Sequence, residues 1–203
     1  MSIAERKLKE KEEMRTLILN GARKVFLREG YEAASIRNIA EEINYSPSSI
    51  YFYFKEKGLI FHELHEEGFR LLLSKHEVLE HVSDPFERLK AMCGVFIDFA
   101  INNKDFYNLM FIVEPPIKKD KNDNRKTLGN KALQNLVDVV KECIDCGRFK
   151  NMDAENLSFT ILSSLHGMSS MFCKDRTSTF TNKSSEQLIK DGSNTLISIL
   201  ERL

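Results

Sequence analysis

The sequence is poor in the residues that interrupt helices and lacks the apolar runs of membrane proteins. Its 203 residues include 4 prolines, 9 glycines, 4 cysteines and no tryptophan. Scarce proline and glycine favour long, uninterrupted elements. No apolar run approaches the roughly 18 residues that a membrane span needs, and the first residues carry no apolar signal region. We therefore expect a cytoplasmic protein with no membrane contact, whose cysteines are free thiols.

Charge of one sign is also missing. Lys+Arg and Asp+Glu both number 30, so the formal net charge is zero and does not by itself indicate a nucleic-acid partner. Residues 1–60 carry 11 basic and 9 acidic side chains, a net of +2, and residues 61–203 carry the opposite net of −2. This asymmetry has the right sign for a DNA contact by the first 60 residues, but it is small.

Patterns that support catalysis are absent. There is no glycine-rich phosphate loop, no G-x-S-x-G and no paired-carboxylate site, so we expect no enzyme, no metal and no cofactor. Cys143 and Cys146 form a lone CxxC, which keeps a thiol oxidoreductase open as an alternative, although no second pair or thioredoxin-like context supports it. His62 and His65 with Glu66 could bind a metal, but a solvated helix face is the favoured interpretation.

Helical periodicity dominates what is present, and it predicts an all-α protein without strands. Apolar residues recur at the helical spacing i, i+3, i+4, i+7. A proline-containing stop at Glu114–Pro116 and a polar linker at 118–126 separate the later helices, and a domain boundary is expected near residue 60. Helices are predicted over residues 10–29, 36–43, 47–54, 59–80, 85–103, 105–113, 128–146, 154–173 and 185–202.

The first three helices contain a helix-turn-helix pattern. The three-residue turn Asn44–Ser46 separates the second helix from the third, and Asn44 is the best non-glycine choice for a positive φ. Ser35 and Ser46 stand where N-caps are wanted, and Pro47 suits the first helical position. Gly30 is expected to end the first helix.

The third helix carries four consecutive aromatic residues, in the run "IYFYF". At about 100° per residue, Ile50 and Phe54 fall on the core side, and Phe52 faces away from it. An outward ring next to the hydroxyls of Ser48 and Ser49 suits a DNA groove. Two alternatives stay open: Phe52 is simply an exposed ring, or the rings meet a protein partner instead of DNA.

The run from Ser35 to Leu64 resembles the DNA-binding region of the TetR family of bacterial transcription regulators. The resemblance covers roughly residues 12–64. Asn44 departs from it by replacing the usual turn glycine, and Gly58 stands where glutamate is common. The matching positions are Ser35, Ile39, Ala40, Ser46, Ile50, Tyr51, Tyr53, Phe54, Lys57 and Leu59.

The resemblance implies an N-terminal helix-turn-helix DNA-binding domain (1–60) followed by a helical ligand-binding and dimerisation domain (61–203). Arg37 would reach a base edge or phosphate, and Ser49 and Phe52 would determine most of the specificity for the DNA base sequence. Tyr51, Tyr53 and Lys57 would touch the DNA backbone. The full set of implied DNA contacts is Ser35, Arg37, Ser46, Pro47, Ser48, Ser49, Tyr51, Phe52, Tyr53 and Lys57.

Residues 86–112 are rich in phenylalanine and methionine, side chains that adapt to the shape of an apolar ligand. The alternative is ordinary core packing, because many of these positions form a plain helical stripe. The candidate effector contacts, with their few polar neighbours, are Met92, Phe96, Phe99, Asn103, Phe106, Met110, Phe111 and His166.

The last two helices combine apolar stripes with small residues that allow close helix approach. Two such helices from each subunit would form a four-helix dimer interface, and the alternative is burial within one subunit. The candidate interface residues are Ser163, Gly167, Ser170, Leu188, Leu196 and Ile199. By resemblance, the protein is expected to be a ligand-responsive repressor that binds a palindromic operator on double-stranded DNA as a homodimer. A small, largely apolar effector would release it.

Overall fold

The computed structural model describes residues 2–113, 127–180 and 182–203, and these are helical with no strand. The all-α prediction is confirmed. The chain divides into two compact units, which comprise the described residues of Met1–Gly68 with Asn108–Asn124, and of Phe69–Tyr107 with Arg125–Leu203. The stop at Glu114–Pro116 and the linker at 118–126 lie outside the described residues. The functional boundary near residue 60 stays a prediction.

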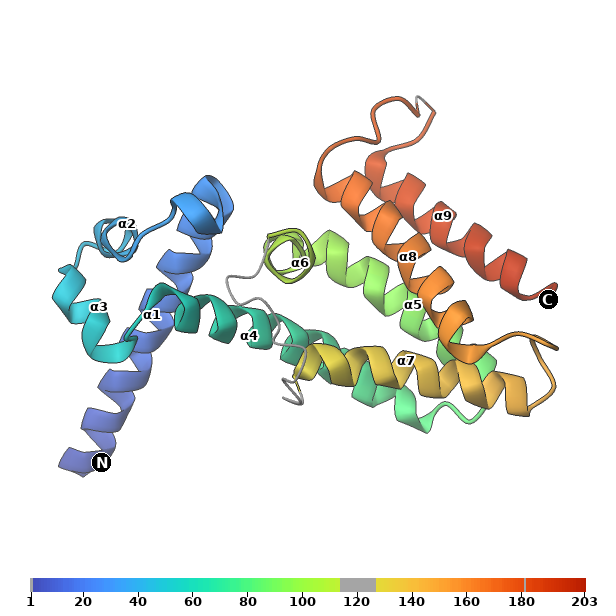
Figure 1. Ribbon diagram of the computed structural model, residues 1–203, viewed down its shortest axis with the longest axis horizontal. Coiled ribbons are helices and arrows are strands. Elements are labelled where there is room, and N and C mark those ends of the chain that lie inside the picture. Colours follow the sequence, from blue (N-terminus) through green and yellow to red (C-terminus); the bar gives the residue numbers. More distant parts are fainter. Residues whose placement is uncertain (1, 114–126, 181) are drawn as a thin grey trace. The chain divides into compact units, whose positions relative to one another are not determined.

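In the first unit, α2 (Ile36–Glu42) and α3 (Pro47–Tyr53) lie beside α1 (Ile3–Ala33), as Figure 1 shows. The first part of α4 (Lys57–Glu77) and residues 108–113, which include the end of α6 (Lys104–Phe111), complete the described part of the unit. Gly21 lets α1 and α2 approach closely, because a Cβ there would lie 2.3 Å from Ile43 Cγ2. The core joins all four helices through Ile18, Ala22, Val25, Phe26, Ile36, Ile39, Ala40, Ile50, Phe54, Ile60, Phe61 and Leu64.

The helix α1 differs from its prediction at its start. It begins at Ile3 rather than residue 10, because Ser2 and Glu5 form a capping box in which the Ser2 hydroxyl accepts from the Glu5 amide at 3.2 Å. Gly30 has a non-helical backbone, with the positive φ of 80° that only glycine adopts readily, so the predicted break of the first helix at Gly30 is confirmed. A second helical stretch follows this kink to Ala33, and the label α1 covers both.

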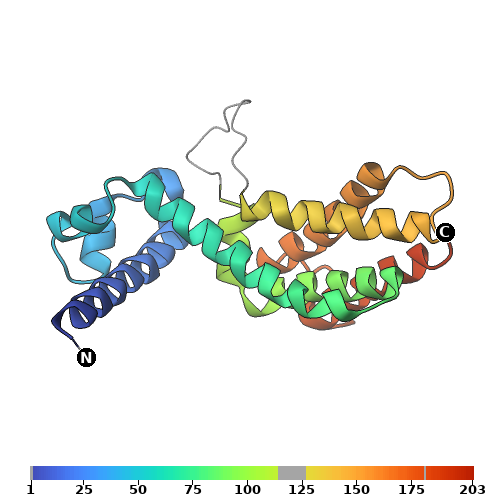
Figure 2. The ribbon, with the colours of Figure 1, turned by 90° about the horizontal axis from the view of Figure 1, so that it is seen from below.

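The second unit is a bundle around α5 (Pro85–Asn102). This helix packs against α7 (Leu128–Asp145), α8 (Ala154–Cys173) and α9 (Ser185–Leu200), as Figure 2 shows. The 3-10 helix η1 (Val78–His81) follows α4, and α6 (Lys104–Phe111) follows α5. Side-chain caps begin α5, α7, α8 and α9, and α8 has the bounds expected from sequence. Among the described residues, no helix has the length and apolar character needed to cross a membrane.

Candidate DNA-binding and effector sites

The start of α3 is fixed by a hydroxyl cluster. The Ser46 hydroxyl accepts a 3.2 Å hydrogen bond from the Ser49 amide and lies 2.8 Å and 2.9 Å from the hydroxyls of Ser48 and Ser49. Pro47 occupies the first helical turn, where a missing amide hydrogen costs nothing. The predicted cap at Ser46 is confirmed, and Ser48 remains exposed at the helix start.

The turn before α3 is held by the backbone. Asn44 has the predicted positive φ, at 58°. The Tyr45 amide donates to the Ala40 carbonyl at 2.9 Å, which closes the end of α2. A tight, hydrogen-bonded turn fixes the angle between α2 and α3, as a helix-turn-helix requires.

The four consecutive rings, three on α3 and the fourth on its C-cap Phe54, lie in different environments. Ile50 and Phe54 are buried in the core of the first unit, at 0% and 3% exposure. Phe52 is 78% exposed and Tyr51 is 52% exposed. Tyr53 is half-buried, and its ring centroid lies 5.1 Å from that of Phe52. One face of α3 therefore holds the helix on the core, and the other presents a hydroxyl and two large rings.

Two predicted DNA contacts lie on α2. Ser35 is its N-cap, and the Ser35 hydroxyl accepts a 3.1 Å hydrogen bond from the Asn38 amide. Arg37 is exposed, and within the described part of the chain its guanidinium takes part in no hydrogen bond or ion pair. Its charge is available to an anionic partner.

Lys57 has a structural role that the sequence did not reveal. Its ammonium donates to the carbonyl oxygens of Tyr31 at 2.6 Å and Ala34 at 2.7 Å, and lies 3.4 Å from that of Glu32. These carbonyls stand at the end of α1, where backbone acceptors lack helical partners. The contact of Lys57 with a DNA phosphate stays a prediction, and it would compete with these bonds.

The second unit brings two predicted effector residues together around Tyr107. The Tyr107 hydroxyl lies 2.8 Å from His166 Nδ1 and donates to the His166 carbonyl at 3.0 Å. The Phe96 ring stands edge-on to Tyr107, with centroids 6.2 Å apart. The sequence placed Phe96 and His166 in the candidate site but missed Tyr107, whose phenol among apolar neighbours was the available signal.

Other predicted effector residues are distributed between the two units. Met92, Phe99 and Phe106 are buried in the second unit, and Asn103 is half-buried at the end of α5. Met110 and Phe111 belong to the first unit. Burial fits both a ligand-lining role and core packing, so this set stays a prediction.

Burial keeps the groups at Tyr107 neutral. It raises the pKa of the Tyr107 phenol far above its usual range, and burial lowers the pKa of His166. A neutral phenol and a neutral imidazole can exchange hydrogen bonds with each other or with an uncharged carbonyl group.

The predicted dimer residues lie on an accessible side of α8 and α9. Ser163, Gly167 and Ile199 are exposed, whereas Leu188 and Leu196 are half-buried, as is Ser170. A Cβ built at Gly167 meets no atom within 4 Å, so its small size serves no packing inside the protomer. Part of the apolar stripe of α8 is buried within the protomer, as Leu157 and Ile161 show.

The CxxC pair lacks the environment of a reactive thiol. Cys143 is buried, and burial raises the pKa of its thiol to about 11, whereas Cys146 is exposed. Activated thiols have lowered pKa values. Within the described residues, no group of three or more His, Cys, Asp or Glu side chains could hold a metal ion.

Two family models match the chain. The model for bacterial regulatory proteins of the tetR family matches residues 18–64, which include α2, α3 and the turn between them. The model described as tetracyclin repressor-like, C-terminal domain, matches residues 89–191, which is more than half of the 203 residues.

Solved structures share the fold over most of their length. The TetR family transcriptional regulator PfmR from Thermus thermophilus is 25% identical, with a TM-score of 0.71 over 89% of this chain and 97% of that one. The fatty acid degradation regulator FadR from Bacillus halodurans is 18% identical, with a TM-score of 0.68 over 90% and 94%. FadR from Bacillus subtilis, in complex with stearoyl-CoA, is 17% identical, with a TM-score of 0.69 over 90% and 97%.

These matches agree with the predicted regulator and place the chain among transcription factors rather than enzymes. The helix-turn-helix lies within the first matched segment, and Phe96, Tyr107 and His166 lie within the second. The chain belongs to the TetR family of bacterial transcription regulators, as a DNA-binding regulator with a ligand-binding domain.

Proposed function

We propose that the protein is a cytoplasmic repressor that binds a palindromic operator as a homodimer and is released by a small, largely apolar effector. The observation that carries the proposal is the exposed face of α3. Ser48, Tyr51 and Phe52 are exposed on a helix whose other side is anchored in the core by Ile50. A recognition helix needs this division, because it must be held rigidly and still present side chains to the major groove.

The residues of this face suit different parts of the duplex. Phe52 can pack on a thymine methyl group, and Ser49 can form a hydrogen bond with a base edge. These two side chains therefore give the protein its specificity for the DNA base sequence. Tyr51 and Tyr53 contact phosphates through their hydroxyls, which fixes the register without reading sequence. Arg37, which has no acidic partner within the described residues, reaches a base edge or a phosphate from α2.

Two copies of α3 read two half-sites, whose centres lie about 34–36 Å apart or a little more. The second copy is supplied by pairing of α8 and α9 with their counterparts in a partner subunit. The exposed Ile199, and the small Ser163 and Gly167, support this pairing because they leave room for a facing helix.

The apolar part of the effector that we propose is a long acyl chain, and coenzyme A, joined to it as a thioester, is its polar carrier. The names of two relatives support it: one regulates fatty acid degradation, and another was solved with stearoyl-CoA. The apolar residues Met92, Phe96 and Phe99 offer a matching lining, and the phenol of Tyr107 becomes a donor to a thioester carbonyl when that carbonyl replaces the backbone carbonyl of His166 as its acceptor. Effector binding shifts the population from dimers that fit the operator to dimers that do not.

DNA binding is tested by selecting fragments from the genomic DNA of the source cell at low salt. The unmodified protein should retain a small set of fragments that contain an inverted repeat, and its affinity should fall steeply as salt rises, because counterions leave the phosphates. Retention of a protein in place of DNA, with weak dependence on salt, would support the alternative of a partner-binding module.

Within this assay, Tyr53→Phe tests the contact with the DNA backbone. The variant should weaken binding to all sequences alike, because a phosphate contact carries no sequence information. Tyr45→Phe removes a phenol from outside the predicted contacts and is the matched control. A loss confined to one base position would contradict the role of Tyr53.

Release is tested by titrating stearoyl-CoA into the protein–DNA complex and following fluorescence anisotropy of the labelled duplex. Release by stearoyl-CoA but not by coenzyme A alone is expected. Equal release by both compounds would assign recognition to the nucleotide part and refute an apolar effector. Replacing Cys143 and Cys146 together with serine should leave binding and release unchanged, whereas the oxidoreductase alternative requires both thiols.

A further inference from the structure

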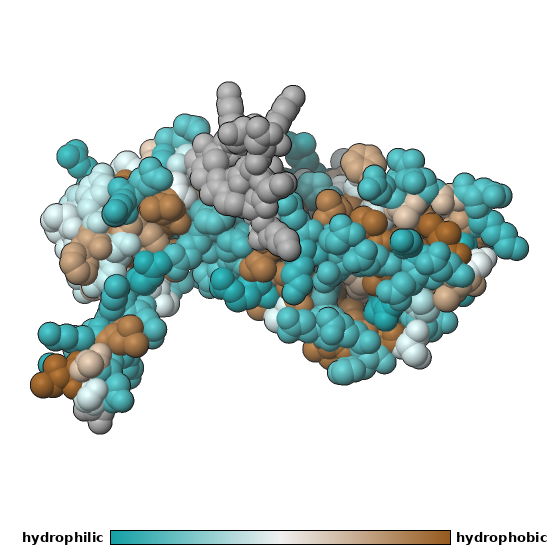
Figure 3. Space-filling model, turned by 60° about the horizontal axis from the view of Figure 1, so that its bottom comes forward, coloured by the Kyte–Doolittle hydropathy of each residue, from teal (hydrophilic) through white to brown (hydrophobic). Residues whose placement is uncertain are grey.

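The first part of α1, residues 3–13, has no role in the core of its unit. Every residue in this segment is exposed, and burial begins with the half-buried Met14 and the fully buried Ile18. Figure 3 shows hydrophilic and hydrophobic side chains together on the exposed end of α1. This segment gains nothing from tertiary packing and is held by its own capping box and by ion pairs along the helix, so its surface is open to a partner.

The charges of this segment are sorted between two sides of the helix. At about 100° per residue, Lys7 and Lys11 fall within about 20° of Ile18, on the side of α1 that faces its own unit. The acidic residues lie at least about 80° from Ile18 by the same geometry. These are Glu5, Glu10, Glu12 and Glu13.

The two sides also differ in pairing. On the outer side, Arg6 pairs with Glu10 at 3.3 Å, and Lys9 pairs with Glu13 at 3.7 Å. The side chains of Lys7 and Lys11 take part in no ion pair or hydrogen bond with any residue that the structure describes. The side that faces the unit is therefore positive and uncompensated.

The side of α1 that carries Lys7 and Lys11, here called the lysine side, is linked to the recognition helix α3 by contacts of Arg15. The Arg15 guanidinium donates to the Tyr53 carbonyl at 3.4 Å, lies 4.4 Å from the centroid of the Phe54 ring and pairs with Glu63. Arg15 is thus packed against the end of α3. Lys11 and Lys7 follow it on the same side of α1, about 6 Å and about 12 Å further along the helix axis.

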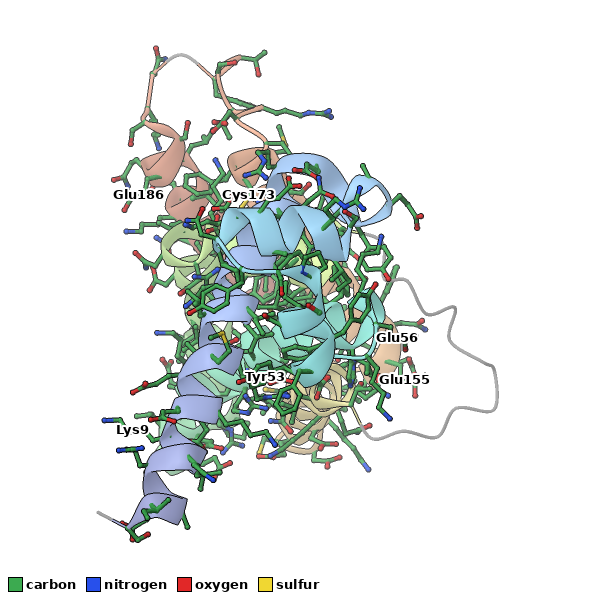
Figure 4. The ribbon with its side chains drawn as sticks, turned by 90° about the vertical axis from the view of Figure 1, so that its left-hand side faces the viewer. Lys9, Tyr53, Glu56, Glu155, Cys173 and Glu186 are labelled. Atoms are coloured by element: carbon green, nitrogen blue, oxygen red, sulfur yellow. The ribbon has the colours of Figure 1, made fainter. Side chains whose placement is uncertain are left out.

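Figure 4 agrees with this division. Lys9, from the outer side, lies on one side of the α1 ribbon, and Tyr53, at the end of α3, lies on the other. The lysine side of α1 therefore adjoins Tyr53, which is itself a proposed contact with the DNA backbone.

We propose that Lys7 and Lys11 bind phosphates of the DNA duplex next to the segment that α3 contacts, so that α1 extends the DNA interface beyond the helix-turn-helix. The proposal rests on the proposed function. Duplex DNA carries one negative charge per about 1.7 Å of its axis, so a row of unpaired lysines beside a recognition helix meets a matching row of phosphates. The contact adds affinity and fixes orientation without reading sequence.

The test compares two double variants of the full chain that remove the same charge. Lys7→Gln/Lys11→Gln removes the lysine side, and Arg6→Gln/Lys9→Gln removes two cations from the outer side. Binding is measured against salt on a duplex from the fragment that the unmodified protein selects, and on a random-sequence duplex.

In the lysine-side variant, the slope of log affinity against log salt should become less steep by about 0.9 for each phosphate that is no longer bound, or about 3.6 for two lysines on each of two protomers. Binding to both duplexes should weaken by the same factor, whereas the outer-side variant keeps the original slope. Circular dichroism should show equal helix content in all three proteins.

Equal slope changes in the two variants would mean a general effect of net charge and would overturn the proposal. An unchanged slope in the lysine-side variant, with the unmodified protein still selecting DNA, would overturn it and leave the proposed function intact. Absence of DNA binding by the unmodified protein would overturn both. Sedimentation velocity then measures the oligomeric state of each variant. If the lysine-side variant alone became monomeric, the lysines would contact a second copy of the chain instead of DNA, and the proposal would be overturned.

Discussion

The ammonium group of Lys57 donates a 2.6 Å hydrogen bond to the carbonyl oxygen of Tyr31 and lies 4.2 Å from the centroid of the Tyr31 ring. The same ammonium bonds to the Ala34 carbonyl at 2.7 Å. The first turn of α4 is thereby fastened to the end of α1, just after the kink at Gly30. A residue expected only to contact DNA also holds together the unit that presents α3.

Replacing Lys57 with alanine should therefore destabilise folding as well as DNA binding. Hydrogen bonds from a charged donor contribute roughly 1.5–3 kcal/mol, so a loss of about 2 kcal/mol in the free energy of unfolding is expected. Lys55→Ala is the matched control, because Lys55 is exposed and its side chain has no partner in the described chain, and it should stay within about 0.5 kcal/mol. Urea titration of both variants measures this, and equal stabilities would contradict the structural role.

The ring of Phe52 on α3 and the ring of its C-cap Phe54 should respond in opposite ways to truncation. Phe54 is buried, so Phe54→Ala should cost about 3–5 kcal/mol of stability through a core cavity. Phe52 is 78% exposed, so Phe52→Ala should change stability by less than about 0.5 kcal/mol and instead alter which operator bases are preferred. Thermal unfolding and binding to a panel of single-base operator variants separate the effects. A stable Phe52→Ala protein with unchanged base preferences would make Phe52 an ordinary exposed ring.

The features that sequence predicted well are those encoded locally. The cap at Ser46, Pro47 in the first turn and the positive φ of Asn44 each depend on neighbours within a few residues, so α3 and its turn could be placed from the chain alone. The separation of Phe52 from Ile50 follows from helical geometry alone, whereas Phe54 is the C-cap of α3 and reaches the core from an extended backbone.

The features that sequence missed depend on partners far along the chain. Lys57 meets a carbonyl 26 residues away, and Tyr107 meets His166 across 59 residues. No periodicity or cap signal brings such pairs together, because their approach is set by the packing of whole helices. The early start of α1 is different: the Ser2–Glu5 capping box was local and readable, but the apolar pattern that guided the prediction begins only later, at Met14.

Two half-buried histidines, His76 and His166, should make the protein sensitive to mild acid. Burial lowers the pKa of His76 and of His166 below the ordinary value of 6.5, so the unfolded chain takes up protons before the folded chain does. Stability is therefore full above about pH 6.5 and is lost as the pH falls through the lowered folded-state values. Melting temperatures between pH 7.5 and 5, a range of about one unit or more on either side of 6.5, should fall less in His76→Gln/His166→Gln than in the unmodified protein.

The control for this loss is a histidine on the surface. His81 is exposed, so His81→Gln removes an imidazole without changing a buried site. The Tyr107 hydroxyl keeps its bond to the backbone carbonyl of residue 166 in the glutamine variant, which preserves one of its contacts. The same fall in melting temperature for all the proteins would show that other groups cause the acid sensitivity.

Charge placed on the α8–α9 side should separate the proposed dimer without unfolding its protomers. Ile199 is 54% exposed in the protomer, so Ile199→Glu puts a carboxylate in water when the chain is alone but buries it when two copies pair. Leu133 on α7 is 47% exposed and lies outside the predicted interface, which makes Leu133→Glu the matched control. Sedimentation velocity should show monomers for the first variant and dimers for the second.

A second substitution tests the same surface by size instead of charge. Gly167→Leu adds a side chain where a Cβ meets no atom of the protomer, so any loss of dimer must come from a facing subunit. Gly192 offers the contrast, because a Cβ there would lie 2.7 Å from Met168 Sδ within the same protomer. The Met168 thioether can move aside at little cost, and alanine favours a helix interior over glycine by about 1 kcal/mol, so Gly192→Ala should leave the dimer intact, whereas Gly167→Leu should separate it and leave the melting temperature unchanged at concentrations where the unmodified protein is already monomeric. If both Ile199→Glu and Gly167→Leu remained dimeric, the pairing surface would lie elsewhere on the chain.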